Sequence, residues 1–362
     1  MTEPHRLAAV VRAFSLDGDF SNAERYGSGH IHDTYFVSLD HDGRVERIIL
    51  QRINTTIFKK PIAVMENIQR VTDHLRLKLD READDDRRVL RLIRTHGGVG
   101  WYVDADGNYW RAYRFIADTH TNDTVTSPHQ AFEAAKAFGN FQRLLVDLPG
   151  PRLHDSIPDF HNTPKRFTDF ERAVKADAVE RCATAGAEIA FALARSSTAR
   201  ALVDGKVPER VTHNDTKLNN VLLDDMTGEG ICVIDLDTVM PGLAAYDFGD
   251  MVRTMTCAAA EDEPDLSQVS MNLSLFEAVL RGYLEGASAF FTTAERNSLI
   301  TGAKVIVFEQ GIRFLADFLS GDVYYKISRP RQNLDRCRTQ FKLLESIEQQ
   351  EDSMARLLRA LP

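Results

Sequence analysis

The chain of 362 residues is poor in cysteine, which limits the disulfide and metal chemistry open to it. Its four cysteines stand far apart and form no C-x-x-C pair, so neither a disulfide framework nor a structural zinc site is expected. The sequence also lacks G-x-x-x-x-G-K-[ST], which argues against a P-loop nucleotide-binding protein. We expect reduced, mostly buried thiols at Cys182, Cys232, Cys257 and Cys337.

Long apolar runs and an excess of positive charge are absent as well. No stretch approaches the roughly eighteen apolar residues of a membrane-spanning helix, and an acid at Glu3 argues against a secretory signal. The 44 basic and 53 acidic residues give a net charge of −9, which weighs against a nucleic-acid partner. With 43% hydrophobic and 27% charged residues, we expect a soluble globular protein in the cytoplasm, with no membrane partner.

The first third of the sequence has the pattern of an antiparallel sheet with one helix. Its strand-like segments are rich in β-branched, aromatic and aliphatic residues, and short turns containing Asp-Gly separate them. A helical period follows the second strand. The expected strands are residues 34–39, 47–51, 100–103 and 109–113, and the expected helix is residues 62–75.

The rest of the sequence is mainly helical. Apolar residues recur with a helical period in five segments, and a pair of short strand-like segments at 220–223 and 231–236 interrupts them. The composition changes near residue 117, so we expect a small lobe at 1–117 and a larger lobe at 118–362, with a ligand cleft between them. The expected helices are residues 129–146, 183–202, 273–285, 303–319 and 334–358.

Polar residues with a chemical pattern are concentrated between residues 213 and 250. His213, Asp215 and Asn220 form H-x-D-x-x-x-x-N, and Asp235 follows at the end of the second short strand. A loop carboxylate such as Asp215 can accept a proton from a substrate hydroxyl. The amide oxygen of Asn220 and the carboxylate of Asp235 are hard ligands that suit Mg²⁺. A base and two metal ligands across a hairpin are what phosphoryl transfer to an alcohol requires.

Several longer segments resemble one protein family. The sequence is similar to the aminoglycoside phosphotransferase and choline kinase superfamily, and most closely resembles its N-acetylhexosamine 1-kinase branch. The resemblance runs from about residue 25 to about residue 345. The segments that carry it are RYGSGHIHDTYFV, ILQRINTTIFKKP, HNDTKLNNVLLD, VIDLDTVMPGLAAYDFGD and EQGIRFLADFLSGDVYYKI.

The resemblance implies a fold and a set of roles. The fold class is α+β, the protein-kinase-like two-lobe fold with a small antiparallel-sheet lobe and a larger helical lobe. Asp215 would be the catalytic base, and Asn220 and Asp235 would bind Mg²⁺, with Asp237 touching the metal or its water. His213 and Asp247 would brace the loop. Arg313 would contact the substrate or the transition state, and the residues assigned to substrate binding are His32, Asp33, Asn214, Asp317 and Tyr324.

The nucleotide would bind to the first lobe. Gly27, Ser28 and Gly29 stand before a strand, where a glycine-rich loop covers phosphate, although the pattern is G-x-G-x-x-H rather than G-x-G-x-x-G. The strand position that carries a phosphate-binding cation in kinases is occupied by Gln51, and the adjacent Arg52 should face the other side. The hinge that would bind adenine is Arg114, Phe115 and Ile116.

These expectations lead to one reaction and three alternatives. The expected reaction is ATP- and Mg²⁺-dependent phosphorylation of the anomeric hydroxyl of N-acetylglucosamine or N-acetylgalactosamine, by a monomer or homodimer. A kinase of the same fold with another small acceptor, such as a different sugar, choline, homoserine or an aminoglycoside, is the first alternative. A silent nucleotide or sugar sensor is the second. A glycosyltransferase with Asp235-x-Asp237 as its metal motif is the third, but it leaves H-x-D-x-x-x-x-N without a role.

Overall fold

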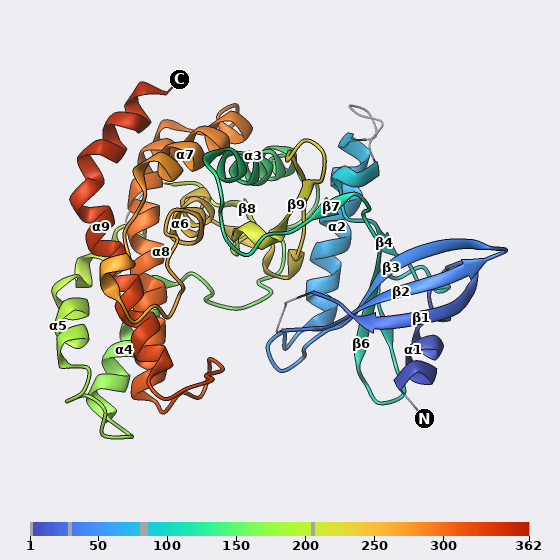
Figure 1. The fold of residues 1–362 in the computed structure, drawn as a ribbon, viewed down its shortest axis with the longest axis horizontal. Coiled ribbons are helices and arrows are strands. Elements are labelled where there is room, and N and C mark those ends of the chain that lie inside the picture. Colours follow the sequence, from blue (N-terminus) through green and yellow to red (C-terminus); the bar gives the residue numbers. More distant parts are fainter. Residues whose placement is uncertain (1–2, 28–30, 80–85, 204–206, 362) are drawn as a thin grey trace.

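The computed structural model describes residues 3–27, 31–79, 86–203 and 207–361. It confirms the predicted fold class, with an antiparallel sheet in the N-terminal part and helices in most of the C-terminal part. Figure 1 shows the blue strands of the sheet on one side and the green-to-red helices on the other, with α2 between them. Among the described residues, no helix has the length and apolar character needed to cross a bilayer.

The N-terminal sheet has six strands in the order β1-β2-β3-β6-β4, and β5 pairs with β6 beside this path. All of these pairs are antiparallel. The Asp42-Gly43 turn joins β2 to β3, and both residues have positive φ, as such tight hairpins require. The elements of this part are α1 (Glu3–Val11), β1 (Asp19–Arg25), β2 (Asp33–His41), β3 (Arg44–Arg52), α2 (Pro61–Leu79), β4 (Leu92–Ile93), β5 (Tyr102–Val103) and β6 (Tyr109–Arg114).

The two faces of this sheet have different surroundings. One face packs against α1 in a small apolar core that includes Val37, Leu50 and Trp110. Alternate residues point to the opposite face, where Gln51 is paired in register with Thr34 on one side and Arg111 on the other. The strand register therefore gathers polar side chains on the face that is not covered by α1.

Short strand pairs connect the sheet to the helices. The strands β7 (Thr119–His120), β9 (Val221–Asp224) and β10 (Gly230–Val233) form one small antiparallel sheet. Another pairs β8 (Arg210–Thr212) with β11 (Met240–Gly242). The segment between β8 and β9 and the segment between β10 and β11 lie side by side as a result. These two segments hold the residues of the predicted motif.

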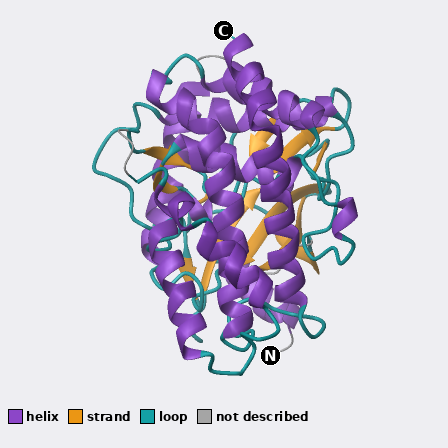
Figure 2. Cartoon of the chain, turned by 90° about the vertical axis from the view of Figure 1, so that its left-hand side faces the viewer, coloured by secondary structure: helices purple, strands orange, loops and turns teal. Residues whose placement is uncertain are grey.

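The helices of the C-terminal part pack against each other and cover these strands, which lie behind the helices in Figure 2. Close helix contacts depend on glycines: a Cβ on Gly302 of α8 would lie 2.1 Å from the carbonyl oxygen of Ala245 in α6. The helices are α3 (Pro128–Leu145), α4 (Thr163–Ala176), α5 (Gly186–Ala194), α6 (Ala244–Met255), α7 (Leu273–Ala287), α8 (Thr293–Leu319) and α9 (Gln332–Ala360).

One large apolar core extends through both parts of the molecule. Residues of α2, among them Val64, Met65 and Ile68, belong to the same cluster as Phe138 of α3 and many residues of the other helices. Asn67, also in α2, donates from its side chain to the carbonyl oxygens of His154 and Val239. The helix that follows β3 is thus packed into the C-terminal part rather than only onto its own sheet.

The structure corrects two predicted helices. The segment predicted as one helix at 183–202 is α5 followed by a separate 3-10 helix (Ser196–Arg200). The helix predicted at 303–319 begins ten residues earlier, at Thr293, where Thr292 and Glu295 form a capping box. The helices α1, α4 and α6 and the edge strand β1 were not predicted.

Candidate active site

The loop after β8 is held in place by Asp247 of α6. The Asp247 carboxylate accepts the backbone N–H of His213 at 2.9 Å and that of Asn214 at 2.7 Å. Burial raises the pKa of Asp247. The His213 ring faces Phe138, and one of its nitrogens lies 2.9 Å from the carbonyl oxygen of Ile234. These contacts agree with the bracing role predicted for His213 and Asp247.

Asp215 stands on this loop with two partners. The Asn220 amide nitrogen donates to its carboxylate at 3.0 Å, and the Lys217 ammonium lies 3.1 Å away. Burial alone would raise the pKa of Asp215, but Lys217, His213 and the hydrogen bond from Asn220 together outweigh it, and the pKa is lowered. Asp215 is therefore an ionised acceptor near neutral pH. Because the Asn220 nitrogen is used on Asp215, its amide oxygen is the atom left for another ligand.

Asp235 lies across from this pair and has no salt bridge within the described chain. It adopts a left-handed conformation with φ 59°, two residues after the end of β10. Burial, with the charges of Asp237 and Asp215, raises the pKa of Asp235 to about 6. A divalent cation would relieve this repulsion, and one carboxylate with one amide oxygen is a donor set that fits Mg²⁺.

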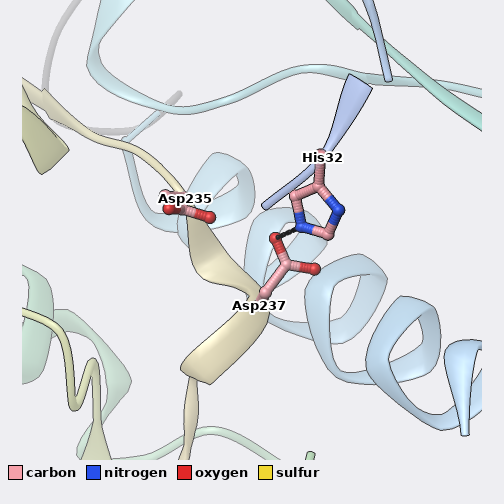
Figure 3. Close-up of side chains that lie close together, drawn as sticks. All are labelled: His32, Asp235 and Asp237. Atoms are coloured by element: carbon pink, nitrogen blue, oxygen red, sulfur yellow. Dashed lines mark hydrogen bonds and ion pairs between the residues drawn. The ribbon is translucent and has the colours of Figure 1, made fainter. Parts of the chain in front are cut away.

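Asp237 was predicted to touch the metal or its water, and it lies in a group with His32 and Asp235 whose ligand atoms are all within 4.8 Å of one another. Arg111 of β6 donates to its two oxygens at 2.6 and 2.5 Å. His32 adds a third contact at 3.2 Å, drawn as the dashed line in Figure 3, which shows Asp235 close to this pair. Burial would raise the pKa of Asp237, but Arg111 and His32 hold it well below its ordinary value. Three donors thus use most of the roughly four acceptor sites of this carboxylate, and a role of Asp237 at the metal stays a prediction.

The His32 contact fixes which ring nitrogen carries the proton. The backbone N–H of Asn54 donates to Nδ1 of His32 at 3.1 Å. The Nδ1 lone pair is therefore in use, and Nε2 holds the proton that faces Asp237. His32 and Asp237 form a contact between β2 and the segment after β10.

A cavity of about 260 Å³ opens between the N-terminal sheet and the short strands. Apolar side chains of both parts line it, among them Ile49, Leu222 and Ile234. Of the predicted site residues it is bordered by Gly27, His32, Gln51, Arg114, Phe115, Ile116, Asn220 and Asp235. Ser28 and Gly29, which were predicted to cover phosphate, lie outside the described residues. The cavity has the apolar walls and polar end that a nucleotide needs.

A group of charged and aromatic side chains belongs to the C-terminal part of the molecule, and its member Arg253 lies near Asp215. The Arg313 guanidinium sits over the rings of Phe160 and Tyr325, at 5.6 and 5.8 Å from their centres. Arg253 of α6 donates to Asp250 at 2.9 Å. Burial would lower the pKa of Arg253, but Asp250 and other acids, Asp215 among them, raise it.

Four predicted substrate residues have other partners. Asp33 is bound by Arg25 and Arg52 and does not line the cavity. The Asn214 side chain is 4% exposed and bonds to Thr212 and to backbone carbonyls. Asp317 accepts the backbone N–H groups of residues 323, 324 and 325. Tyr324 is 63% exposed, and it is Tyr325 that packs on Arg313. These contacts assign Asn214 and Asp317 to holding loops.

The sequence reasoning missed three cations at the site. Lys217 stands two residues after Asp215, and that spacing was a usable signal. Arg253 lies one helical turn after Asp250, which is the i, i+3 spacing of a helix-face pair. Arg111 had no local signal, because its partners are 60 and 126 residues away in the chain.

Comparison with known proteins agrees with this geometry. The sequence profile of the phosphotransferase enzyme family matches residues 22–285, which contain all the residues placed around Asp215 except those of α8 and the loop after it. The chain belongs to this phosphotransferase family. The family assignment confirms the broader resemblance seen in the sequence, and it leaves the N-acetylhexosamine 1-kinase branch as a prediction.

Solved structures of other phosphotransferases share the fold at low sequence identity. An aminoglycoside phosphotransferase from Alicyclobacillus acidocaldarius matches with a TM-score of 0.60 at 14% identity, covering 98% of this chain and 96% of that one. A spectinomycin phosphotransferase in complex with ADP and spectinomycin gives 0.57 at 14%, covering 95% and 98%. A choline kinase from Cryptosporidium parvum gives 0.57 at 13%, covering 99% of each chain.

Proposed function

We propose that this phosphotransferase uses ATP and Mg²⁺ to phosphorylate the anomeric hydroxyl of N-acetylglucosamine or N-acetylgalactosamine. The observation that carries the proposal is the group formed by Asp215, Asn220 and Asp235. Asp215 is an ionised acceptor bonded to Asn220, and Asn220 and Asp235 border the cavity that has room for a nucleotide. Support also comes from the spectinomycin phosphotransferase of the same fold, which was solved with ADP.

The side chains suggest a direct transfer. Asp215 orients the acceptor hydroxyl and takes its proton as the oxygen attacks the terminal phosphorus of ATP, and ADP leaves on the opposite side. Lys217 lies beside Asp215 and borders the cavity, so its ammonium can balance charge on the transferring group. No covalent enzyme intermediate is needed, because the acceptor oxygen forms its bond to phosphorus as the bond to ADP breaks.

Asn220 and Asp235 are the residues that would hold Mg²⁺. When bound there, Mg²⁺ would supply positive charge that offsets the negative charge developing during the transfer. The amide nitrogen of Asn220 is bonded to Asp215, so its oxygen is directed by a fixed side chain. Asp237 lies close to Asp235, but Arg111 and His32 already bond to its carboxylate, so it is left out of the proposed set.

The side chains around Arg253 and Arg313, where the acceptor would bind, favour a neutral polyol over a polycation. Arg253 is close enough to Asp215 for that acid to help raise the pKa of Arg253, and the charge of Arg253 in turn opposes the rise in the pKa of Arg313. Two guanidinium groups would repel the ammonium groups of choline or an aminoglycoside and would donate hydrogen bonds to sugar oxygens. One Asp250 oxygen is buried without a partner among the described residues and can accept from a hydroxyl. Aromatic rings of Phe160 and Tyr325 complete a surface suited to a sugar.

The deciding experiment measures ADP release with ATP and Mg²⁺ against N-acetylhexosamines, other sugars, choline, homoserine and kanamycin. Turnover on N-acetylhexosamines is expected, with a product that has no reducing end. The Asp215→Asn variant should lower kcat by about 10²- to 10⁴-fold while keeping its melting temperature. Asp73→Asn, a matched change of an exposed acid of α2, should leave kcat unchanged.

Each other outcome has a definite meaning. Turnover on choline or kanamycin alone would overturn the substrate and keep the phosphotransferase mechanism. An Asp215→Asn variant with nearly normal turnover would remove Asp215 from the role of base. Nucleotide binding without turnover on any acceptor would replace the proposed enzyme with a sensor.

A further inference from the structure

Arg111 is a fully buried cation at the edge of the nucleotide cavity. Its guanidinium is 1% exposed and lies 5.5 Å from the centre of the Tyr113 ring. Gln51 accepts from its Nε at 2.9 Å, and Asp237 accepts from both of its terminal nitrogens. Five N–H groups belong to a guanidinium, so these contacts leave two without an acceptor in the described chain. The same residue borders the cavity together with Gln51 and Asp235.

The other cations of the sheet are less well placed. Gln51 is neutral, and the neighbouring Arg52 is turned to the other face, where it is bound to Asp33. Arg114 borders the cavity, but its side chain is 53% exposed and is paired with Glu46 at 2.5 Å. Among the described residues of the sheet that line the cavity, Arg111 is therefore the cation that combines burial with spare N–H groups.

A buried guanidinium needs a reason, because removing a charge from water is costly. Asp237 compensates the charge, and burial does not neutralise Arg111, since Asp237 and nearby acids raise its pKa. One N–H remains on each terminal nitrogen, and each can make a charge-assisted hydrogen bond to a phosphate oxygen. The Asp237 and Gln51 contacts fix the direction of these two N–H groups before any ligand arrives.

We infer that Arg111 binds the phosphate groups of the nucleotide, and that Asp237 and Gln51 are positioning residues that hold it for this purpose. The inference rests on the proposed use of a nucleoside triphosphate. It assigns to β6 the phosphate-binding cation that the sequence lacks on β3. Gln51 of β3 and Arg111 of β6 are direct neighbours in the strand register. Compared with a kinase that has a cation at the Gln51 position, the positive charge here lies one strand away on the same face of the sheet.

The test compares nucleotides that differ only in their phosphates. Calorimetry with Mg²⁺ present would give the dissociation constants of ADP and adenosine, and of GDP and guanosine, and their ratio measures what the phosphates contribute. For Arg111→Gln, we expect the ADP constant to rise by about tenfold or more, as charge-assisted bonds are lost. Adenosine binding should stay unchanged. Arg52→Gln is the control, because it removes a neighbouring cation on the opposite face.

A second variant distinguishes a loss of phosphate binding from misfolding. Arg111→Gln leaves Asp237 buried without its cation, which can unfold the site. The exchange variant Gln51→Lys/Arg111→Gln keeps one positive charge beside Asp237 and moves it to β3. We expect this exchange to regain most of the phosphate contribution, with a melting temperature closer to that of the unaltered protein. A purely structural salt bridge would not restore discrimination between ADP and adenosine.

The outcomes separate this inference from the proposed function. An ADP-to-adenosine ratio unchanged in a folded Arg111→Gln variant would overturn the role of Arg111 alone. Equal losses for ADP and adenosine, in that variant and in the exchange variant, would make Arg111 a structural residue of the cavity. An unaltered protein that binds neither ADP nor GDP would overturn the proposed function, and the phosphate role with it.

Discussion

His161 is a buried histidine that contacts the loop carrying Asp215. Its Nε2 lies 3.0 Å from the carbonyl oxygen of Asn214, and its Nδ1 lies 2.9 Å from a carboxylate oxygen of Glu309. Both neighbours are acceptors, so both ring nitrogens must carry protons and the ring is a cation. Burial would lower the pKa of His161, but the charge and hydrogen bond of Glu309, with the Asn214 carbonyl, raise it. Burial would likewise raise the pKa of Glu309, but His161 and its other partners lower it.

This pair predicts a pH-dependent stability. The raised pKa of His161 makes its contribution complete below the ordinary value of 6.5 and progressively lost as pH rises through the folded value. The lowered pKa of Glu309 makes its contribution fall away below the ordinary value of 4.5. The difference in melting temperature between the unaltered protein and His161→Gln should therefore be largest between these values, equivalent to about 2 kcal/mol. It should shrink above pH 6.5.

The check is a series of thermal melts from pH 4 to about 9, a range that spans both ordinary pKa values. His129→Gln, which changes an exposed histidine, should show no such trend. A His161→Gln difference that stays constant from acid to alkaline pH would contradict an ionised pair.

For single residues, the sequence was a better guide to groups within one hairpin than to contacts between segments that are far apart in the chain. Asp215, Asn220 and Asp235 come together because a short hairpin separates them, and local spacing is enough to see this. Asp237 stands only two residues from Asp235, yet its partner Arg111 lies on another sheet. Strand register decides which carboxylate is paired with a cation and which has no salt bridge. The sequence of one strand does not reveal which residues of another strand lie beside it.

At the scale of elements, the contact between α6 and α8 positions the loop that holds Asp215. A Cβ on Gly249 of α6 would lie 2.4 Å from the Gly302 carbonyl oxygen, and one on Gly302 would lie still closer to Ala245. Such distances are shorter than any real contact of a Cβ, so the two helices touch by their backbones. Asp247, two residues from Gly249, is the acceptor for the loop N–H groups.

Gly302→Ala should therefore affect both stability and catalysis. The added methyl group must push α8 and α6 apart, which we expect to cost about 1–3 kcal/mol in the free energy of unfolding. Because Asp247 moves with α6, the kcat of the folded variant should fall as well. Urea titration and ADP release measure the two effects.

Gly186→Ala is the matched control for this prediction. Gly186 begins α5, and a Cβ there would meet nothing within 4 Å. Alanine favours helix over glycine, so this variant should be neutral or slightly more stable. If Gly302→Ala behaved in the same way, the close packing of α6 and α8 would be wrong.

Helix boundaries show which local signals were informative. The capping box of Thr292 and Glu295 is a sequence pattern of the type [ST]-x-x-[DE], and it marks the true start of α8. The predicted helix at 183–202 ends early, and the residues that follow α5 are Ser196, Ser197 and Thr198, which favour turns and caps over helix interiors. Apolar periodicity alone extends across both kinds of boundary, so it located the helices but not their ends.

At the scale of the whole molecule, the N-terminal sheet and the C-terminal helices share a core through α2. Val64, Met65 and Ile68 are fully buried, and they pack in the same cluster as the helices of the C-terminal part. Removing either part would expose this apolar surface to water. The two parts should therefore stabilise each other rather than unfold one at a time.

The two tryptophans make this testable without a label. Trp101 and Trp110 both lie in the N-terminal part, whereas the helical signal at 222 nm comes mostly from the C-terminal part. We expect tryptophan fluorescence and circular dichroism to give the same midpoint in urea. A fluorescence transition at clearly lower urea would show that the sheet unfolds first and that the shared core contributes little.

The left-handed backbone of Asn214 and Asp235 affects how substitutions at the site must be interpreted. Their φ angles are 66° and 59°, a region in which asparagine, aspartate and glycine are tolerated and a residue such as alanine is strained. Alanine at either position would twist the loop besides removing a functional group. A scan by alanine would thus overstate their chemical importance, and the isosteric exchange of amide for carboxylate is the substitution that isolates charge from shape.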